Sequence, residues 1–399
     1  MFRVLLLFLF ALATRSAELQ WLHLSSTNGH LPLHSSEAKV HSGSLVGDFD
    51  GDKTNDFIIA FADAAPALVL YRGGTNWTTL PIELEQLAIG AGGAALDIDQ
   101  DGDLDAIFGS EAGPDLWWWE NPRPNFDARK PWVRRPIRSA GASMNRGQIV
   151  ADLTGAGWPQ VLFWNQGTNT LFHAPIPSEV RKQSNWVATP IFTAPTAPPG
   201  TLHTLASIDL NIDGLLDVVA GNYWLRRVDG FRFEPTRIGN VQGRSAIGRF
   251  RDSTYPQIVI APQTERGRAT WYECKSHPER SDSWAGRHLL GHDIAATATL
   301  AIADLNKDGN DDIFLTERKE PTQTSTEHSP NAWIFFSDGR GNFRATLFGS
   351  GLEIYEAKIF DVDADNDLDI VSTPHSAGAP RLDIWLNVTD FARPPIEPK

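Results

Sequence analysis

Residues 304–315 read DLNKDGNDDIFL, an acidic loop of nine residues that runs directly into an apolar strand. Oxygen-bearing side chains stand at loop positions 1, 3, 5 and 9, which are Asp304, Asn306, Asp308 and Asp312, and a glycine stands at position 6. The glycine permits a sharp turn that brings positions 1, 3 and 5 toward one point, and position 9 closes the shell from the start of the strand. The stretch therefore predicts a tight hairpin loop that binds a hard cation.

The same unit occurs seven times, with loop starts at residues 48, 97, 152, 209, 249, 304 and 361, and such self-similarity indicates a repeat architecture. In the first loop Lys53 stands at the glycine position, and in the last loop Asn366 does. Five copies keep the acids. Their metal-ligand candidates are Asp48, Asp50, Asp52 and Asp56; Asp97, Asp99, Asp101 and Asp105; Asp209, Asn211, Asp213 and Asp217; Asp304, Asn306, Asp308 and Asp312; and Asp361, Asp363, Asp365 and Asp369.

Two copies keep the frame but have lost most of the acids. The loop that starts at Asp152 ends in Gln160, whereas the loop that starts at Arg249 also carries Arg251 and ends in Gln257. We therefore expect up to five cation sites in seven equivalent hairpins.

Each unit continues with a Trp/Tyr-rich segment, a turn rich in Pro, Gly and Asn, and often a further segment that begins with Trp. Four short strands per unit are the content of one propeller blade. The last unit ends one strand short, while ELQWLHLS at 18–25 resembles a fourth strand placed before the first unit. The sequence predicts an all-β, seven-bladed β-propeller of four-stranded blades over 18–390, closed by an N-terminal strand that completes the last blade and followed by a proline-rich tail at 391–399.

The N-terminus indicates export. Residues 1–17 combine Arg3 with an apolar run of about ten residues and small residues at the end, as in a signal peptide. That run is too short to span a bilayer, and no other run approaches the required length. Because Cys274 is the only cysteine, no disulfide can form within the chain. We therefore expect bound metal to stabilise the exported chain instead. We expect a secreted or periplasmic monomer without a transmembrane segment.

The charge distribution also indicates bound metal ions. Lys and Arg number 35 against 49 Asp and Glu, and the net charge of −14 argues against a general nucleic-acid binder. Of the acids, 18 are ligand candidates in the five acidic loops, and without them the chain has 31 acids and 35 bases. Because crowded carboxylates repel one another, a bound metal ion should stabilise the fold.

The ligand chemistry favours calcium. Three or four carboxylate or amide oxygens in a flexible loop suit Ca²⁺ better than Mg²⁺. An EF-hand is unlikely, because Phe108, Ala220 and Leu315 stand where its twelfth position requires Glu, and no helices flank the loops. A saturated oxygen shell leaves no open position for chemistry, so these sites should be structural.

The pattern D-x-[D/N]-x-D-G-x-x-D followed by an apolar strand resembles the FG-GAP/VCBS repeats of integrin α-subunit propellers and of many exported bacterial proteins. The resemblance covers essentially the whole mature chain. Its Trp-rich outer strands are also similar, more weakly, to VCBS-type propellers of aldos-2-ulose dehydratase-like proteins. In integrin-like propellers the face opposite the calcium hairpins binds ligands, and the resemblance implies the same here.

No nucleophile elbow, P-loop, dinucleotide fingerprint, H-E-x-x-H or C-x-x-C motif is present. Candidates for a site are therefore taken from the loops that precede first strands or follow second strands, which gather on that opposite face. The catalytic candidates are His203, Arg244, Arg146, Tyr355 and His41, and the ligand-binding candidates are Asn145, Glu111, Glu265, Arg318 and His375.

Two functions remain open. The first is a non-catalytic module that binds carbohydrate or an extracellular protein partner. The alternative is a carbohydrate lyase or dehydratase, in which arginines would pair with a uronate carboxylate and His203, His41 or Tyr355 would transfer protons. A third reading is that these loops are polar only because they face water.

Overall fold

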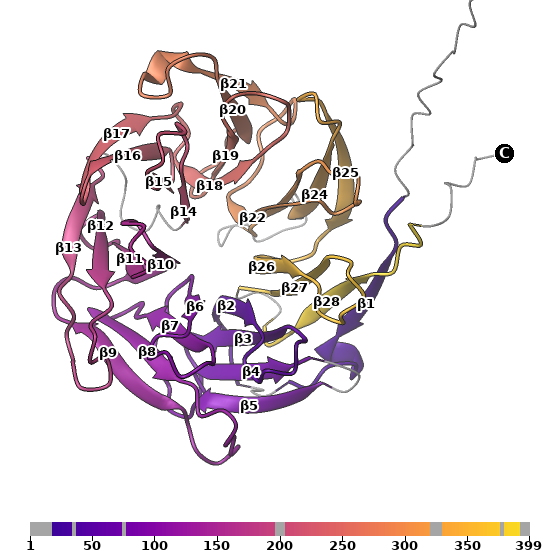
Figure 1. The fold of residues 1–399 in the computed structure, drawn as a ribbon. Coiled ribbons are helices and arrows are strands. Elements are labelled where there is room, and N and C mark those ends of the chain that lie inside the picture. Colours follow the sequence, from indigo (N-terminus) through magenta and orange to yellow (C-terminus); the bar gives the residue numbers. More distant parts are fainter. Residues whose placement is uncertain are drawn as a thin grey trace, which may run out of the picture.

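The computed structural model describes residues 18–33, 37–73, 77–195, 204–319, 329–375 and 379–391, which form a ring of seven antiparallel sheets with four strands each (Figure 1). The strand order within each sheet follows the chain from the centre of the ring outward, except in the seventh sheet. The predicted seven-bladed propeller is therefore confirmed. Among these residues, no helix is long and apolar enough to cross a membrane.

The strands have the following bounds. The first blade consists of β2 (His41–Gly47), β3 (Asp56–Phe61), β4 (Leu68–Arg72) and β5 (Thr78–Glu83), and the second of β6 (Ala94–Leu96), β7 (Asp105–Gly109), β8 (Asp115–Glu120) and β9 (Val133–Ser139). The third consists of β10 (Asn145–Ala151), β11 (Gln160–Asn165), β12 (Thr170–Pro175) and β13 (Thr189–Thr193), and the fourth of β14 (Leu205–Ile208), β15 (Asp217–Ala220), β16 (Tyr223–Asp229) and β17 (Arg232–Arg237). The fifth consists of β18 (Gly243–Gly248), β19 (Gln257–Pro262), β20 (Thr270–Cys274) and β21 (Trp284–His288), and the sixth of β22 (Thr297–Ala303), β23 (Asp312–Glu317), β24 (Asn331–Ser337) and β25 (Phe343–Ser350). The seventh consists of β26 (Tyr355–Phe360), β27 (Asp369–Thr373), β28 (Asp383–Asn387) and β1 (Trp21–Ser25).

The N-terminal strand closes the ring, as the sequence predicts. β1 pairs with β28 in antiparallel register, so that Trp21 lies opposite Asn387 and Ser25 opposite Asp383. His23 strengthens this pair, because its ring nitrogen Nε2 lies 3.0 Å from Asp383 Oδ1. Pairing of the two chain ends leaves the seventh blade with the same four strands as the others.

The core lies between the blades, because successive residues of a strand face opposite sides of its sheet. On β8, Trp118 packs into the cluster shared with the third blade, whereas Trp119 packs into the cluster shared with the first blade. Both side chains are fully buried. Packing between neighbouring sheets thus accounts for these two tryptophans.

Six of the seven hairpins between first and second strands share one backbone conformation. Positions 4 and 6 of these loops have left-handed backbone, with φ between 55° and 97°. At position 4 the residues are Gly51, Gln100, Gly155, Ile212, Lys307 and Ala364, and at position 6 they are Lys53, Gly102, Gly157, Gly214, Gly309 and Asn366. Glycine adopts this conformation without strain, which accounts for its frequency at position 6.

The ninth residue of each hairpin ties the hairpin to its own blade. The Asp312 carboxylate accepts hydrogen bonds from the backbone N–H of Leu305 (3.2 Å) and of Ser337 (3.0 Å), at the end of the third strand. In a hairpin without the acids, Gln257 Oε1 accepts the equivalent bond from Phe250 N (2.7 Å). The glutamines therefore keep the structural part of this role while they lose the charge.

Candidate ligand cavity and cation-binding hairpins

Three of the predicted hairpins bring carboxylates together. In each, three carboxylates offer oxygens within 4.8 Å of one another: Asp48, Asp50 and Asp56; Asp97, Asp99 and Asp101; and Asp361, Asp363 and Asp365. The hairpins at 209 and 304 hold an asparagine at position 3, and its Nδ2 donates to the aspartate at position 5, as in Asn306 to Asp308 (3.0 Å). The donor set consists only of oxygens, which fits a hard divalent cation.

Arginines approach the first two hairpins. Arg72 Nε lies 2.5 Å from Asp50 Oδ2. Arg181, from the blade that follows, places Nη2 2.7 Å from Asp99 Oδ2 and 2.7 Å from Asp101 Oδ2. The Asp99 side chain is only 2% exposed, and its oxygens accept no well-directed hydrogen bond within the described part of the chain. Such a buried carboxylate requires a cation, and both a metal ion and Arg181 satisfy that requirement.

Burial raises the pKa of the ninth-position carboxylates, and the neighbouring loop carboxylates add to this effect. The pKa is about 7 for Asp56, Asp312 and Asp369, about 8 for Asp105 and about 6 for Asp217. A bound divalent cation would favour the ionised forms. We therefore expect cation binding and proton release at these hairpins to be linked.

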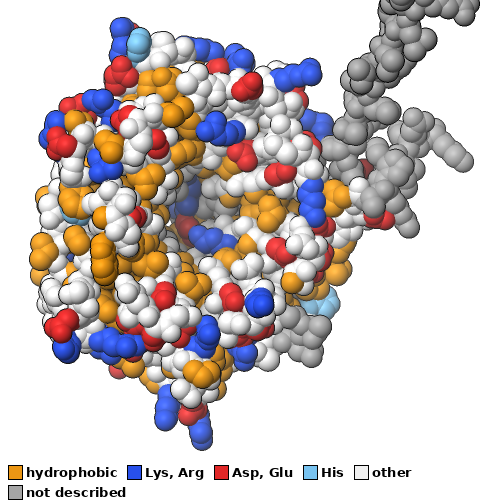
Figure 2. All heavy atoms as spheres, in the orientation of Figure 1, with side chains coloured by type: hydrophobic (Ala, Val, Ile, Leu, Met, Phe, Trp, Pro, Cys, Tyr) orange, Lys and Arg blue, Asp and Glu red, His pale blue; other side chains and the backbone are white. Residues whose placement is uncertain are grey.

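A cavity of about 250 Å³ lies on the ring axis, where first strands begin and second strands end. The acidic hairpins join the opposite ends of these strands, so the cavity is on the other face of the propeller. Figure 2 shows the hollow at the centre of the ring, with basic and acidic side chains inside it. Six of the sequence-predicted candidates line this one cavity, and they come from five blades: Arg146, Arg244, Glu111, Arg318, Tyr355 and His375.

Arg244 forms part of the cavity wall, where it is held by a buried ion pair. Its side chain is 6% exposed, Nη2 lies 2.5 Å from Glu356 Oε1, and Nε donates to the backbone oxygen of Thr297 (3.3 Å). Burial alone would lower the pKa of Arg244, but Glu356 more than offsets this effect and the pKa is raised. Arg244 also lines a channel of about 540 Å³ along the ring axis, together with Glu356 and Lys358.

Arg146 is held by a second acid. Its Nε donates to Glu111 Oε2 (2.6 Å), its Nη2 bonds Glu111 Oε1, and its Nη1 donates to Gln166 Oε1 (3.1 Å). This fork-to-fork pairing fixes the plane of the guanidinium. Glu111 is itself 36% exposed, so the pair remains accessible from the cavity.

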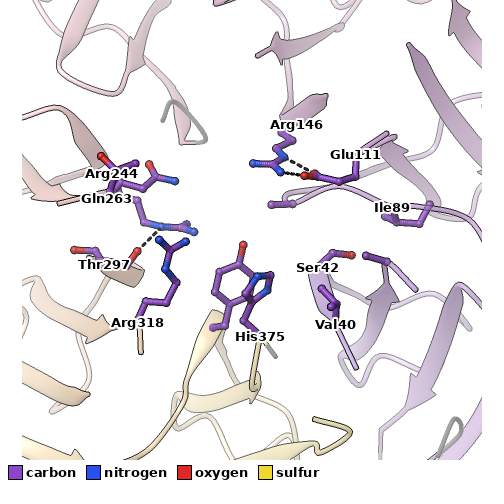
Figure 3. Close-up of a pocket in the computed structure, with 14 residues that line it drawn as sticks. Val40, Ser42, Ile89, Glu111, Arg146, Arg244, Gln263, Thr297, Arg318 and His375 are labelled. Atoms are coloured by element: carbon purple, nitrogen blue, oxygen red, sulfur yellow. Dashed lines mark hydrogen bonds and ion pairs between the residues drawn. The ribbon is translucent and has the colours of Figure 1, made fainter. Parts of the chain in front are cut away.

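Arg318 differs from the other two arginines. Its backbone N–H is bound to Ala296 O (2.6 Å), but within the described ranges its guanidinium has no carboxylate or hydrogen-bond partner. Figure 3 shows Arg318 and Arg244 extending into the cavity from one side and Arg146 from the other side. Because Arg318 lacks a carboxylate partner within the described ranges, the cavity wall carries a positive charge that is chemically suited to an anion.

Tyr355 and His375 form an aromatic wall of the cavity, with ring centroids 4.4 Å apart. His375 Nδ1 lies 3.1 Å from the backbone oxygen of His41. Because a carbonyl oxygen only accepts, Nδ1 carries the proton and Nε2 keeps its lone pair. Burial lowers the pKa of His375, which keeps it neutral at pH 7, and burial raises the pKa of Tyr355, which keeps its hydroxyl protonated.

Three further buried polar side chains line the cavity and were not predicted from the sequence. They are Ser42, Gln263 and Thr297, all at most 5% exposed. Within the described structure, Ser42 Oγ, Gln263 Oε1 and Thr297 Oγ1 are buried and have no hydrogen-bond partner. Buried polar atoms usually have partners, so these atoms are suited to hydroxyl or amine groups of a ligand, or to water. These three residues are of common types and belong to no sequence motif, so nothing in the sequence was a reason to select them.

The remaining candidates lie elsewhere. His41 is buried behind the wall, with its ring edge-on to Phe61, and burial lowers its pKa to about 3. Asn145 is buried and donates Nδ2–H to Pro114 O (2.7 Å), a structural contact. Glu265 is exposed and does not line the cavity, and His203 lies outside the described residues.

Comparisons with known proteins agree with this architecture. Residues 48–108 match the family described as FG-GAP-like repeat. No curated protein matches the chain. Solved structures with a similar fold include an Agrocybe aegerita lectin described by its recognition of non-reducing terminal N-acetylglucosamine, with 15% identity, 77% of this chain and 80% of that chain covered, and a TM-score of 0.50. Another is a chain in the complex of BBS1N with ARL6DN, with 11% identity, 96% of this chain and 100% of that chain covered, and a TM-score of 0.54.

Proposed function

We propose that this seven-bladed propeller, of which residues 48–108 match the FG-GAP-like repeat, is an exported binding module for an acidic carbohydrate. The ligand would enter the axial cavity, and Ca²⁺ in the hairpins of the opposite face would stabilise the ring. The observation that carries the proposal is the Arg318 guanidinium, which lines the cavity with Arg244 and, among the described residues, has no carboxylate partner, together with cavity-lining polar atoms that have no hydrogen-bond partner in the same part of the chain.

The chemistry of the cavity fits a sugar acid. The carboxylate of a uronate would pair with Arg318, since guanidinium groups bind carboxylates through two parallel hydrogen bonds. The ring hydroxyls would satisfy the polar atoms of Ser42, Gln263 and Thr297. The volume of about 250 Å³ suits one sugar residue better than a larger ligand.

Calorimetric titration tests this proposal with D-glucuronate, D-galacturonate and the neutral sugars glucose and galactose. We expect a uronate to bind and the neutral sugars to bind more weakly. Arg318→Ala should weaken uronate binding about 10- to 100-fold, because a hydrogen bond to a charged group contributes about 1.5–3 kcal/mol. Arg266→Ala is the matched control, because Arg266 is exposed on the same face and does not line the cavity. Absence of uronate binding, or equal losses in the two variants, would contradict the proposal.

The calcium part of the proposal has its own test. Metal analysis of the purified protein should find bound calcium, and a chelator should lower the melting temperature. Each site occupied at 100 times its Kd adds about 2.7 kcal/mol to the free energy of unfolding. A protein that contains no calcium and melts at one temperature with and without chelator would refute structural calcium sites.

A lyase is the second candidate, and the Tyr355–His375 pair favours it. In β-elimination, a base removes the proton next to the uronate carboxylate, the C–O bond at the β carbon breaks, and the departing oxygen takes up a proton. His375 Nε2 has the lone pair of a base, and protonated Tyr355 has the proton of an acid. Incubation with polygalacturonate, followed at 235 nm, decides between the candidates. Turnover that is lost in His375→Gln while uronate binding persists supports the lyase, and binding without turnover supports the module.

A further inference from the structure

We infer that the axial cavity is selective for ligands with a single negative charge, and that Glu111 sets this limit by pairing with Arg146. The inference rests on the proposed function and adds a rule about which acidic ligands the cavity accepts. Under this rule, uronates bind, and phosphorylated sugars with the same ring are excluded.

Of the three arginines that line the cavity, one lacks a carboxylate partner within the described ranges. Arg146, Arg244 and Arg318 are the three cations that line it. Glu111 pairs with Arg146 and Glu356 pairs with Arg244, so only Arg318 lacks a carboxylate partner within the described ranges. His375 is neutral, and Lys358 lines the axial channel and not the cavity. One ligand carboxylate therefore matches the one arginine of the cavity wall that has no carboxylate partner within the described ranges.

The carboxylates of Glu356 and Glu111 differ in how exposed they are. Glu356 is 10% exposed and Arg244 is 6% exposed, so this pair is nearly closed to a ligand. Glu111 is 36% exposed and lines the cavity itself, while Arg146 is 15% exposed. A second negative charge on a ligand would therefore approach Glu111 before it could reach Arg146, and like charges at an interface disfavour binding. Repulsion of this kind is a common source of specificity.

Glucuronate and glucose 6-phosphate provide a matched pair of probes. Both carry their acidic group at carbon 6, but the carboxylate has one negative charge, whereas a phosphate monoester has about 1.5–2 at pH 7. We expect the wild-type protein to bind glucuronate at least about tenfold more tightly than glucose 6-phosphate. In Glu111→Gln, Arg146 loses its carboxylate partner, and the repulsion between Glu111 and the ligand disappears. The affinity for glucose 6-phosphate should therefore rise by about tenfold, and the two ligands should bind with similar affinity.

Glu265→Gln is the control, because it removes one exposed acid from the same face without touching the cavity. It should leave the ratio of affinities unchanged, because an exposed distant charge is screened by salt. Thermal melting shows whether each variant is folded, and Arg146 keeps its bond to Gln166 when Glu111 is replaced.

The outcomes separate the two proposals. If glucuronate does not bind the wild-type protein, the proposed function fails and this inference fails with it. If glucuronate binds but glucose 6-phosphate binds as tightly, or if folded Glu111→Gln keeps the wild-type ratio, only the charge rule is overturned.

Discussion

At the scale of single residues, the ninth position of the hairpins shows how one site combines two roles. Its carboxylate accepts backbone hydrogen bonds within the blade, and it also belongs to the acidic loop. Gln160 and Gln257 preserve the first role, since Gln160 Oε1 accepts from Leu153 N (2.9 Å). The charge at this position is therefore dispensable for the fold and is specific to the acidic hairpins.

The raised pKa of Asp312 predicts a pH effect in metal-free protein. Its pKa is about 7 in the folded state and near 3.9 when unfolded, so between pH 5 and 6 the folded state holds one proton more. This contribution to the free energy of unfolding is complete below about pH 4 and is lost progressively as pH rises to about 7. In Asp312→Asn, the slope of the free energy against pH should become less negative by about 1.4 kcal/mol per pH unit, measured by denaturant unfolding in chelator. If the free energy of unfolding depends on pH with the same slope in both proteins, the raised pKa of Asp312 is contradicted.

Lys53 adopts an unfavourable backbone conformation in the first hairpin. Its φ of 74° is left-handed, and the conformation strains any residue with a β-carbon. Lys53→Gly should raise the free energy of unfolding by about 1 kcal/mol, as measured by denaturant unfolding. Lys53→Ala removes the same charge but keeps the strain, so a gain in both variants would assign the effect to charge and refute the backbone explanation.

At the scale of the structural elements, Arg181 links the second hairpin to the loop that follows β12. Its guanidinium lies between Asp99 and Asp101, and its Nε also donates to Glu120 (2.8 Å). A cation bound at this hairpin would compete with Arg181 for the same oxygens. The hairpins are thus equivalent in backbone but differ in the neighbours that their carboxylates meet.

Replacement of Arg181 should therefore tighten cation binding at the second hairpin. We expect Arg181→Ala to raise the Ca²⁺ affinity of one site severalfold in calorimetric titration, and to lower the melting temperature in chelator, because Asp99 then lacks its counter-charge. Lys182→Ala is the control, since Lys182 pairs with exposed Glu179 and not with the hairpin. Weaker or unchanged Ca²⁺ binding in Arg181→Ala would show that the arginine does not compete.

At the scale of the whole molecule, we expect the free energy of unfolding to depend on closure of the ring by β1. Trp21 packs edge-on against Phe348 of the sixth blade, with ring centroids 5.4 Å apart, whereas neighbouring Leu22 is 49% exposed. Trp21→Ala should lower the free energy of unfolding by about 2–3 kcal/mol, less than for a fully buried aromatic side chain. Leu22→Ala should cost under 0.5 kcal/mol. Similar denaturation curves for both variants would mean that β1 contributes little to closure.

The sequence predicts the ring because the fold is repetitive. A hairpin loop and an apolar strand recur seven times, with the acids kept in five copies, and a Trp-led segment at the N-terminus supplies the strand that the last unit lacks. The cavity could be predicted only in part. Charged candidates in rim loops converge there, but Ser42, Gln263 and Thr297 come from three different blades and carry no motif. Likewise, nothing near Arg181 in the sequence connects it with Asp99, because that contact arises from the packing of adjacent blades.

The register of β1 on β28 has a mechanical consequence. Because Trp21 lies opposite Asn387, the chain enters and leaves this strand pair at the same end. A force applied to the two termini would load the hydrogen bonds of the pair one after another, as in a zipper, and would not shear them together. A propeller tethered through both termini should therefore open at low tension, and single-molecule stretching would detect this as an early, small extension before the blades themselves unravel.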